Sequence, residues 1–309
     1  MPLVVQYSGR SGTQLINVVL PYYNRFTTLD RFVSRFTKLV LDGQQHLMLT
    51  VVRYTDGFPT MGEDEGKRDH DNVVKCINEA NLKMGGGESR IRLVEKHAIF
   101  SRGAALMEGA RAWDSRQDVI LFLCDVDIAF GKSFLQRCRA NTQPAQKAYF
   151  PVVFSSYNPD IVYSVIKKKP VPVLTNYDRK RLINRDLGYW IDFGFGMSCQ
   201  YLSDFRRLSG DFLNITGWGL EDVRLYEQFQ KSSVGIVRMP DPDLVHVYHK
   251  KQCSKYEVGR RFNSCLKSKA LNEASRLEWG LWVYKNMGDT DDVREFLKIF
   301  QQAQVAGGG

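Results

Sequence analysis

Apolar residues along the chain alternate between short continuous runs and helical spacing, starting at residue 16. Ile16–Tyr23 is a mostly apolar run that predicts a buried strand, and apolar residues from Leu29 to Val40 then recur at helical spacing. A second strand over Leu47–Tyr54 and a second helix over Asp69–Lys83 repeat the pattern. Because such alternation is typical of parallel sheets, we predict an α/β fold with a single Rossmann-like, mostly parallel central sheet flanked by helices.

The alternation continues for a further sixty residues. Ile91–Glu95 predicts a short strand, and Ser101–Trp113 predicts a helix capped by Ser101. Val119–Cys124 is almost wholly apolar, as expected for a strand that is buried on both faces. Tyr149–Phe154 predicts one more strand, while polar residues over Thr55–Arg68 predict a loop after the second strand.

The second half of the chain has a less regular pattern. Asn158–Tyr189 is rich in Lys, Arg, Pro and Asn, and it predicts a long surface loop. Beyond it the pattern predicts two helices and two strands, near Gln200–Leu208, Leu220–Lys231, Val234–Arg238 and Leu244–Tyr248, before a C-terminal helical segment. We see no internal repeat and predict one domain over residues 16–287, with an N-terminal extension (1–15) and a C-terminal helix and disordered tail (288–309).

Composition supports a folded domain and limits its partners. The 309 residues are 43% hydrophobic, which is enough to bury a large core. The net charge of +9 predicts a polyanionic partner: nucleic acid, an acidic membrane or an acidic polysaccharide. No nucleic-acid-binding motif accompanies the charge, so we expect no nucleic-acid partner. No apolar run approaches the roughly 20 residues that span a bilayer and no signal peptide is recognisable, so the chain as given is expected to be soluble.

The six cysteines are too sparse for a disulfide scaffold, but one pair is suggestive. Cys253 and Cys265 flank a polar, basic loop, where a disulfide would be useful if the compartment is oxidising. A reduced pair is the equal alternative. A glycosylation sequon at Asn214-Ile215-Thr216 would fit a secretory compartment.

Two acidic residues, Asp125 and Asp127, follow the buried strand Val119–Cys124. Alternation of side chains along a strand would project both carboxylates to one side. Ligands bind beyond the carboxyl ends of strands in open α/β sheets, and two hard oxygen ligands there suit Mn2+ or Mg2+ bridging a diphosphate. The alternative is an ordinary acidic strand end.

Two histidines, His246 and His249, end the last predicted strand. Imidazole binds Mn2+ readily and would complete a ligand set of carboxylate and diphosphate oxygens. Strict alternation would put the two rings on opposite faces, so both can ligate only if the backbone turns between them; His249, nearer the strand end, is preferred. The alternative is a half-buried pair that bonds to backbone groups.

A third group of candidate residues occupies Gly217–Asp222. The indole of Trp218 lies between glycines, which let a sugar ring approach it closely. Glu221 and Asp222 fall in the first turn of a predicted helix, where carboxylates also stabilise the helix dipole. Because adjacent helical residues point about 100° apart, only one of the two can serve as a general base.

Six motifs follow one another along the chain, namely Pro21–Arg25, Phe100–Gly103, Asp125–Asp127, Phe193–Gly196, Trp218–Asp222 and His246–His249. In this order they resemble the motifs of the galactosyltransferase-type family of inverting GT-A enzymes. Three segments look more narrowly like the chondroitin N-acetylgalactosaminyltransferases, namely Arg139–Pro144, Gly194–Tyr201 and Lys269–Ser275. The resemblance covers about Ile16–Tyr284 and implies a GT-A catalytic domain over residues 16–287.

The resemblance also implies a role for each matched residue. The positions that match contacts to the uridine and diphosphate are Pro21, Tyr22, Asn24, Arg25 and Arg102. Asp125 matches a position near the ribose and the metal, and the matched metal ligands are Asp127, His249 and, less directly, His246. Trp218 matches the residue between donor and acceptor sugars, Glu221 an acceptor contact and Asp222 the catalytic base.

The activity implied is that of a metal-dependent hexosaminyltransferase. It would use Mn2+ or Mg2+ and move N-acetylgalactosamine, with inversion, from UDP-N-acetylgalactosamine to a glucuronic-acid-terminated, chondroitin-type glycosaminoglycan, forming a β1,4 linkage. Basic residues at Lys167–Lys169 and Arg179–Arg181 could attract this polyanion. The alternatives are a transferase of the same fold that uses UDP-galactose or UDP-N-acetylglucosamine, and a non-catalytic glycosaminoglycan-binding subunit of a synthase.

Members of this family usually reside in the Golgi lumen behind an N-terminal anchor and stem. The chain shows neither, so we expect a catalytic fragment or a bacterial-style soluble version, which would meet a membrane only through an anchor absent from the chain. Association with other chondroitin synthases is a further expectation. Arg224 stands where many galactosyltransferase relatives have an acidic residue, so the acceptor preference is expected to differ from theirs.

Overall fold

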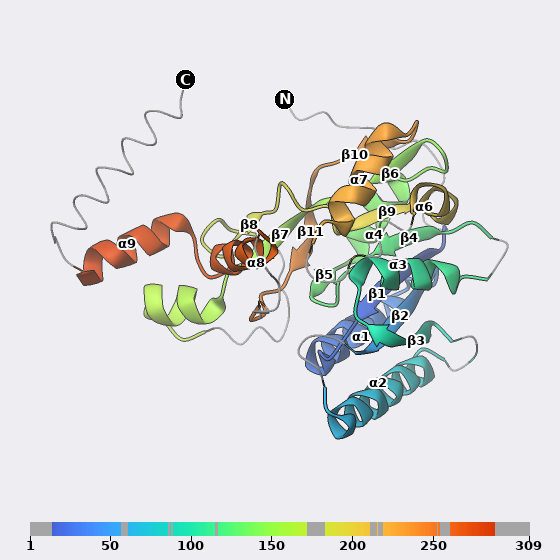
Figure 1. Ribbon diagram of the computed structural model, residues 1–309, viewed down its shortest axis with the longest axis horizontal. Helices are drawn as coiled ribbons and strands as arrows, with labels where there is room; N and C mark the ends of the chain where they lie inside the picture. The colour runs from blue at the N-terminus through green and yellow to red at the C-terminus, as the bar shows by residue number, and fades with distance from the viewer. Residues whose placement is uncertain are drawn as a thin grey trace.

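The computed structural model describes residues 14–56, 61–85, 87, 89–114, 117–171, 183–210, 215, 219–251, 253 and 260–287. Its central sheet has seven strands in the order β10-β6-β9-β4-β1-β2-β3 (Figure 1). They are β1 (Ile16–Tyr22), β2 (Leu47–Asp56), β3 (Ile91–Ile99), β4 (Ile120–Leu123), β6 (Lys147–Tyr149), β9 (Ser198–Tyr201) and β10 (Gly235–Val237). Only β9 runs antiparallel to its neighbours, β4 and β6. The predicted α/β class with a mostly parallel central sheet is therefore confirmed.

Helices cover both faces of this sheet, because its central strands are apolar on both sides. In β1, Val18 and Leu20 lie in one core cluster while Val19 lies in the other. The first face is covered by α1 (Phe26–Leu41), α2 (Glu63–Lys83) and α4 (Lys132–Ala140). The second is covered by α3 (Arg102–Arg111), α6 (Leu202–Leu208) and α7 (Glu221–Lys231).

A second sheet of four strands, which the sequence reading did not predict, lies beside the first (Figure 1). Its order is β5 (Ile128–Phe130), β11 (Pro240–His246), β7 (Val152–Ser156) and β8 (Gly188–Trp190). The predicted strand Tyr149–Phe154 is in fact divided between β6 and β7. Pro151 stands at the division and has no N–H to donate, while the amides of Phe150 and Val152 bond to Val237 and Met239.

Other boundaries also differ from the prediction. Helix α2 starts inside the predicted loop, at Glu63, because three acidic residues in its first turn stabilise the helix start. The helix predicted from Gln200 begins at Leu202, since Gln200 is buried and paired with Leu121 in the sheet. The predicted loop Asn158–Tyr189 contains a π-helix, η1 (Asp160–Ile166). Strand β5 and helix α4 were not predicted.

Two disulfides bridge four of the six cysteines. Cys253 and Cys265 are joined, with Cα atoms 5.8 Å apart, as one of the two sequence alternatives anticipated. Cys138 and Cys199 form a second bridge, unpredicted, between α4 and β9. Two further helices, α8 (Arg260–Leu271) and α9 (Arg276–Met287), complete the fold. None of the described helices is both long and apolar enough to cross a membrane.

Candidate active site

The segment from Asp125 to Asp127 follows β4 as predicted, but it is a turn between β4 and β5, so the side-chain alternation of a strand does not apply to the two carboxylates. The amide of Ile128 donates to the carbonyl of Asp125 at 3.1 Å and closes the turn. Since β4 belongs to the central sheet and β5 to the smaller one, the turn lies where the chain passes from one sheet to the other. The amide of Val247 donates to the carbonyl of Asp127 at 2.9 Å, which joins the turn to the end of β11.

Asp127 is 6% exposed, and three cationic or basic side chains lie close to its carboxylate. Arg25 Nη1 lies 2.9 Å and His249 Nε2 3.0 Å from its Oδ2, while His246 Nε2 lies 3.7 Å from Oδ1. Both histidines reach it because β11 ends at His246 and the chain then leaves the strand. Burial alone would raise the pKa of Asp127, but the histidines and Arg25 outweigh it and hold the pKa below its ordinary range.

These three residues fit a divalent cation. One ligand atom from each of Asp127, His246 and His249 lies within 4.8 Å of the others, and Oδ1 of Asp127 is buried with no hydrogen-bond partner. His246 Nδ1 lies 3.0 Å from Ser155 Oγ, which leaves Nε2 for a ligand. Burial lowers the pKa of His246 to about 4, so its ring is neutral at pH 7, the form that binds metal. The donor set suits Mn2+.

Arg102 connects several of the predicted site residues. Its Nε lies 2.6 Å from Asp125 Oδ1 and its Nη1 3.4 Å from Glu221 Oε1, while Nη2 donates to the carbonyl of Gly196 at 2.7 Å. It occupies the first position of α3, whose N-cap is Ser101 as predicted. Burial disfavours its charge, but the carboxylates outweigh burial and raise the pKa of Arg102. The Arg102 guanidinium thus connects Asp125, which the resemblance matches to the donor, with Glu221, which it matches to the acceptor.

The two acidic residues at the start of α7 face different partners. Glu221 is buried against Arg102, whereas Asp222 Oδ2 accepts the amide N–H of Phe195 at 3.3 Å. Leu220, just before them, has φ of 84°, which non-glycine residues rarely adopt and which often marks functional sites. The helix therefore starts from a strained turn, and helix geometry points the two adjacent carboxylates about 100° apart. Trp218 lies outside the described residues.

Tyr22, a predicted nucleotide contact, has its side chain inside the protein. It is 1% exposed, its hydroxyl donates to Asp69 at 2.5 Å and accepts the amide N–H of Arg25 at 3.2 Å. Asp69 also accepts a hydrogen bond from the buried Arg53 at 3.0 Å. In this arrangement Tyr22 attaches the loop that carries Arg25 to a buried ion pair.

The other two predicted residues of this loop lie on either side of Tyr22. Pro21 is buried in β1 and pairs with Val52 of β2. Asn24 has φ of 43° and its side-chain amide donates to Glu65 at 3.2 Å. The loop therefore leaves the carboxyl end of β1 as expected, and it delivers the Arg25 guanidinium to Asp127.

Several residues at this site were missed by sequence reasoning. Ser155 comes from β7 and meets His246 only because the two strands pair, so no local signal identifies it. Lys251 stands two residues after His249, and that proximity could have pointed to it. Burial lowers the pKa of Lys251, while the charge of Asp127 opposes that shift.

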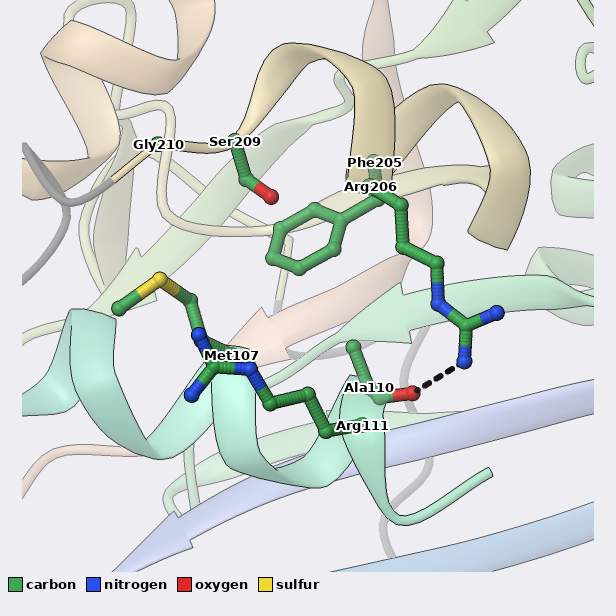
Figure 2. Close-up of a pocket in the computed structure, with 7 residues that line it drawn as sticks. All are labelled: Met107, Ala110, Arg111, Phe205, Arg206, Ser209 and Gly210. Atoms are coloured by element: carbon green, nitrogen blue, oxygen red, sulfur yellow. Dashed lines mark hydrogen bonds between the residues drawn. The ribbon is translucent and has the colours of Figure 1, made fainter. Parts of the chain in front are cut away.

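A surface hollow between α3 and α6 is distinct from these residues (Figure 2). Two of its lining residues are joined by a hydrogen bond, which Arg206 Nη2 donates to the carbonyl of Ala110 at 3.4 Å (Figure 2). It is lined by Met107, Ala110, Arg111, Phe205, Arg206, Ser209 and Gly210. None of these is a predicted site residue.

Known proteins resemble this chain over most of its length. Human chondroitin sulfate N-acetylgalactosaminyltransferase 1 is 38% identical over 272 residues, covering 88% of this chain and 48% of that protein. Human chondroitin sulfate N-acetylgalactosaminyltransferase 2 is 35% identical over 277 residues, covering 89% and 47%. The chain thus spans about half the length of these curated relatives.

Similarity to solved structures is weaker. The catalytic domain of Drosophila β1,4-galactosyltransferase 7, crystallised with xylobiose, aligns over 82% of this chain and 79% of its own, with 13% identity and a TM-score of 0.45. A likeness of this degree carries no argument about substrates. The profile of the family described as chondroitin N-acetylgalactosaminyltransferase, in contrast, matches residues 4–278. The chain belongs to the chondroitin N-acetylgalactosaminyltransferase family.

Proposed function

We propose that this chain is the catalytic domain of an inverting glycosyltransferase. It moves N-acetylgalactosamine from UDP-N-acetylgalactosamine to a glucuronic-acid-terminated, chondroitin-type acceptor and forms a β1,4 linkage. Family membership and the names of the two human relatives support the sugar and the acceptor class. The observation that carries the proposal is the convergence of Asp127, His246 and His249 into a group that fits a divalent cation.

The donor would bind at the turn after β4. A divalent cation held by Asp127, His246 and His249, Mn2+ or Mg2+, would offset the negative charge of the departing diphosphate. Arg25, whose side chain is 34% exposed and reaches Asp127, supplies a further positive charge there. Lys251, which interacts electrostatically with both Asp125 and Asp127, supplies another.

Asp222 is proposed as the base. The acceptor hydroxyl attacks the anomeric carbon as the bond to UDP breaks, its proton passes to Asp222, and the new bond forms on the opposite face of the donor sugar. Of the two acidic side chains at the start of α7, Glu221 is already paired with Arg102. Asp222 Oδ1 accepts the amide N–H of Val223 at 2.9 Å, so two backbone amides orient this carboxylate. Trp218 is proposed between the two sugars.

The remaining proposals concern the setting of the enzyme. Two disulfides support an oxidising compartment, which fits the Golgi lumen. The net charge of +9 supports a polyanionic acceptor such as a glycosaminoglycan. Association with other chondroitin synthases stays a prediction.

UDP release tests the proposal directly. The protein is incubated with Mn2+, a chondroitin oligosaccharide that ends in glucuronate, and UDP-N-acetylgalactosamine, UDP-galactose or UDP-N-acetylglucosamine in turn. We expect acceptor-dependent release with UDP-N-acetylgalactosamine and loss of at least about a hundredfold in kcat for Asp222→Asn. Glu227→Gln, an exposed acid on the same helix, is the matched control and should behave as wild type.

The other possible results of this assay would change the donor, the base or the proposed catalytic function. Release with a different donor keeps the transferase and changes its sugar. Unchanged transfer by Asp222→Asn removes the base assignment. If wild type releases no UDP with any donor yet still binds the oligosaccharide, the chain is a non-catalytic glycosaminoglycan-binding subunit.

A further inference from the structure

One aromatic side chain beside the candidate base is left in solvent. Phe193 is 91% exposed, the highest exposure among the large apolar side chains of the described ranges. It lies on a turn that the amide of Gly194 closes by donating to the carbonyl of Ile191 at 3.4 Å. A Cβ at Gly194 would come 2.6 Å from Ile191 Cγ2, so the turn is tight. Asp192 and Phe193 therefore form its tip.

The tip is held by contacts on both sides of Phe193. The guanidinium of Arg238 donates to the carbonyl of Asp192 and, at 3.2 Å, to that of Gly194. The same guanidinium lies 4.6 Å from the ring centre of Phe195, and Phe195 stacks on Tyr226 with centroids 4.0 Å apart. Phe193 is therefore presented to solvent by a braced turn, and its ring adds little to the packing of the fold.

The same turn is joined to the candidate base. The amide of Phe195 donates to Asp222 Oδ2 at 3.3 Å, and Phe193 precedes Phe195 by two residues. Two residues span at most about 7 Å, so the backbone of Phe193 lies within about one sugar ring of the amide that orients Asp222. Tyr226, which supports Phe195, belongs to the same helix as Asp222. An acceptor that reaches Asp222 with its terminal sugar passes close to this tip.

We propose that Phe193 is the platform of an acceptor subsite, which binds the sugar next to the terminal glucuronate. The inference rests on the proposed function. An aromatic face packs against the C–H face of a pyranose, and the braced turn already holds the backbone that carries the ring, so less entropy is lost when a sugar binds. The neighbouring carboxylate of Asp192 is exposed and disfavours a uronate, so the subsite takes the neutral N-acetylhexosamine of the chain.

Acceptor length separates this subsite from the catalytic centre. We measure KM and kcat for methyl glucuronide and for a chondroitin oligosaccharide ending in glucuronate, with wild type, Phe193→Ala and Phe193→Tyr. The alanine variant should raise the KM of the oligosaccharide about tenfold, while the KM of methyl glucuronide, the KM of the donor and kcat stay unchanged. The tyrosine variant keeps an aromatic face and should restore the wild-type KM.

A control and a binding measurement complete the test. Leu82→Ala removes another exposed apolar side chain, 72% exposed on α2, and should change none of these constants. Saturation-transfer NMR with the oligosaccharide and UDP should show contacts to the second sugar in wild type that Phe193→Ala loses. Equal KM for wild type and Phe193→Ala, or an equal rise for both acceptors, overturns the subsite. If wild type releases no UDP, the proposed function is wrong. The NMR contacts to the second sugar, and their loss in Phe193→Ala, then test the subsite on their own.

Discussion

Helix α3 packs onto the central sheet through Gly109, and an alanine there tests whether this close approach positions Arg102. A Cβ at Gly109 would lie within 3.0 Å of Val19 Cγ1 and 3.1 Å from Val52 Cγ2, on the two strands beneath. Carbon atoms normally touch at about 3.5 Å, so the helix would have to move outward by roughly half an ångström or more. Arg102 begins the same helix and would move with it.

Two opposing effects set the magnitude. Alanine in place of glycine in a helix is favourable by about 1 kcal/mol, whereas forcing a methyl group into a packed core costs about 1 to 3 kcal/mol. Steric conflict with Val19 and Val52 should outweigh the gain in helix propensity, giving a net loss of up to about 2 kcal/mol in the free energy of unfolding. Displacement of Arg102 from Asp125 should also lower UDP release roughly tenfold, because catalytic geometry tolerates little misplacement.

The matched control is another helical glycine. Gly66 lies in α2, and an added Cβ there meets nothing within 4 Å. Gly66→Ala should therefore be neutral or stabilise the protein by up to about 1 kcal/mol. Urea unfolding gives the free energy of unfolding of both variants. Because both replace a helical glycine by alanine, the gain in helix propensity is common to them, and the difference between them reports the steric conflict at Gly109.

A double mutant identifies the contact responsible. Val19→Ala removes the methyl group nearest to the added Cβ, so adding Gly109→Ala to it should cost far less than adding it to wild type. The loss of UDP release caused by Gly109→Ala should likewise be smaller in the Val19→Ala protein than in wild type. The reasoning is refuted if Gly109→Ala is as stable as Gly66→Ala, or if the Val19 background does not lessen its effect.

Three further predictions concern the site and its support. Asp127→Asn should abolish the rise in unfolding temperature that Mn2+ produces in wild type; a retained rise would mean that the ion binds elsewhere. Ser155→Ala should weaken Mn2+ binding about tenfold by calorimetry, because Ser155 fixes the ring of His246, and an unchanged affinity would contradict this. Asp69→Asn should destabilise the fold by about 3 kcal/mol in urea, since it deprives the buried Arg53 of a carboxylate; a loss below about 1 kcal/mol would show that Glu95 suffices.

The first half of the fold could be predicted because local pattern and tertiary role agree there. Ile16–Tyr22 and Leu47–Asp56 are buried over nearly their whole length, so their apolar runs identify them as central strands. Helix α1 buries one stripe of residues, which its spacing shows directly. The pattern of these strands and helices is therefore enough to predict the α/β class from the sequence.

The second sheet could not be predicted, because its strands carry little local signal. Strand β5 has three residues, Ile128–Phe130, which is too short to show a period. It exists through antiparallel pairing with β11, more than a hundred residues later. Pairings of that separation depend on the whole fold and leave no trace in a short window.

The candidate site shows the same division. Residue type and order made Asp127, His249 and Asp222 candidates, because the chemistry of these side chains is visible in the sequence. Ser155 and Arg238 have ordinary identities and act through contacts with distant segments. Such supporting residues could be found only once the strands and turns were placed beside one another.

The state of the six cysteines allows unfolding of the chain to be followed by thiol alkylation. Four are held in disulfides, and Cys124 is fully buried. Cys76 is accessible in part, but burial and the nearby Asp30 raise the pKa of its thiol to about 12, so at neutral pH it is almost entirely protonated and unreactive. Alkylating reagents should therefore modify the native protein very slowly and the unfolded chain at two thiols. When the reagent is concentrated enough for alkylation to outpace reclosing, the time course of alkylation gives the opening rate without a sugar ligand or an activity assay.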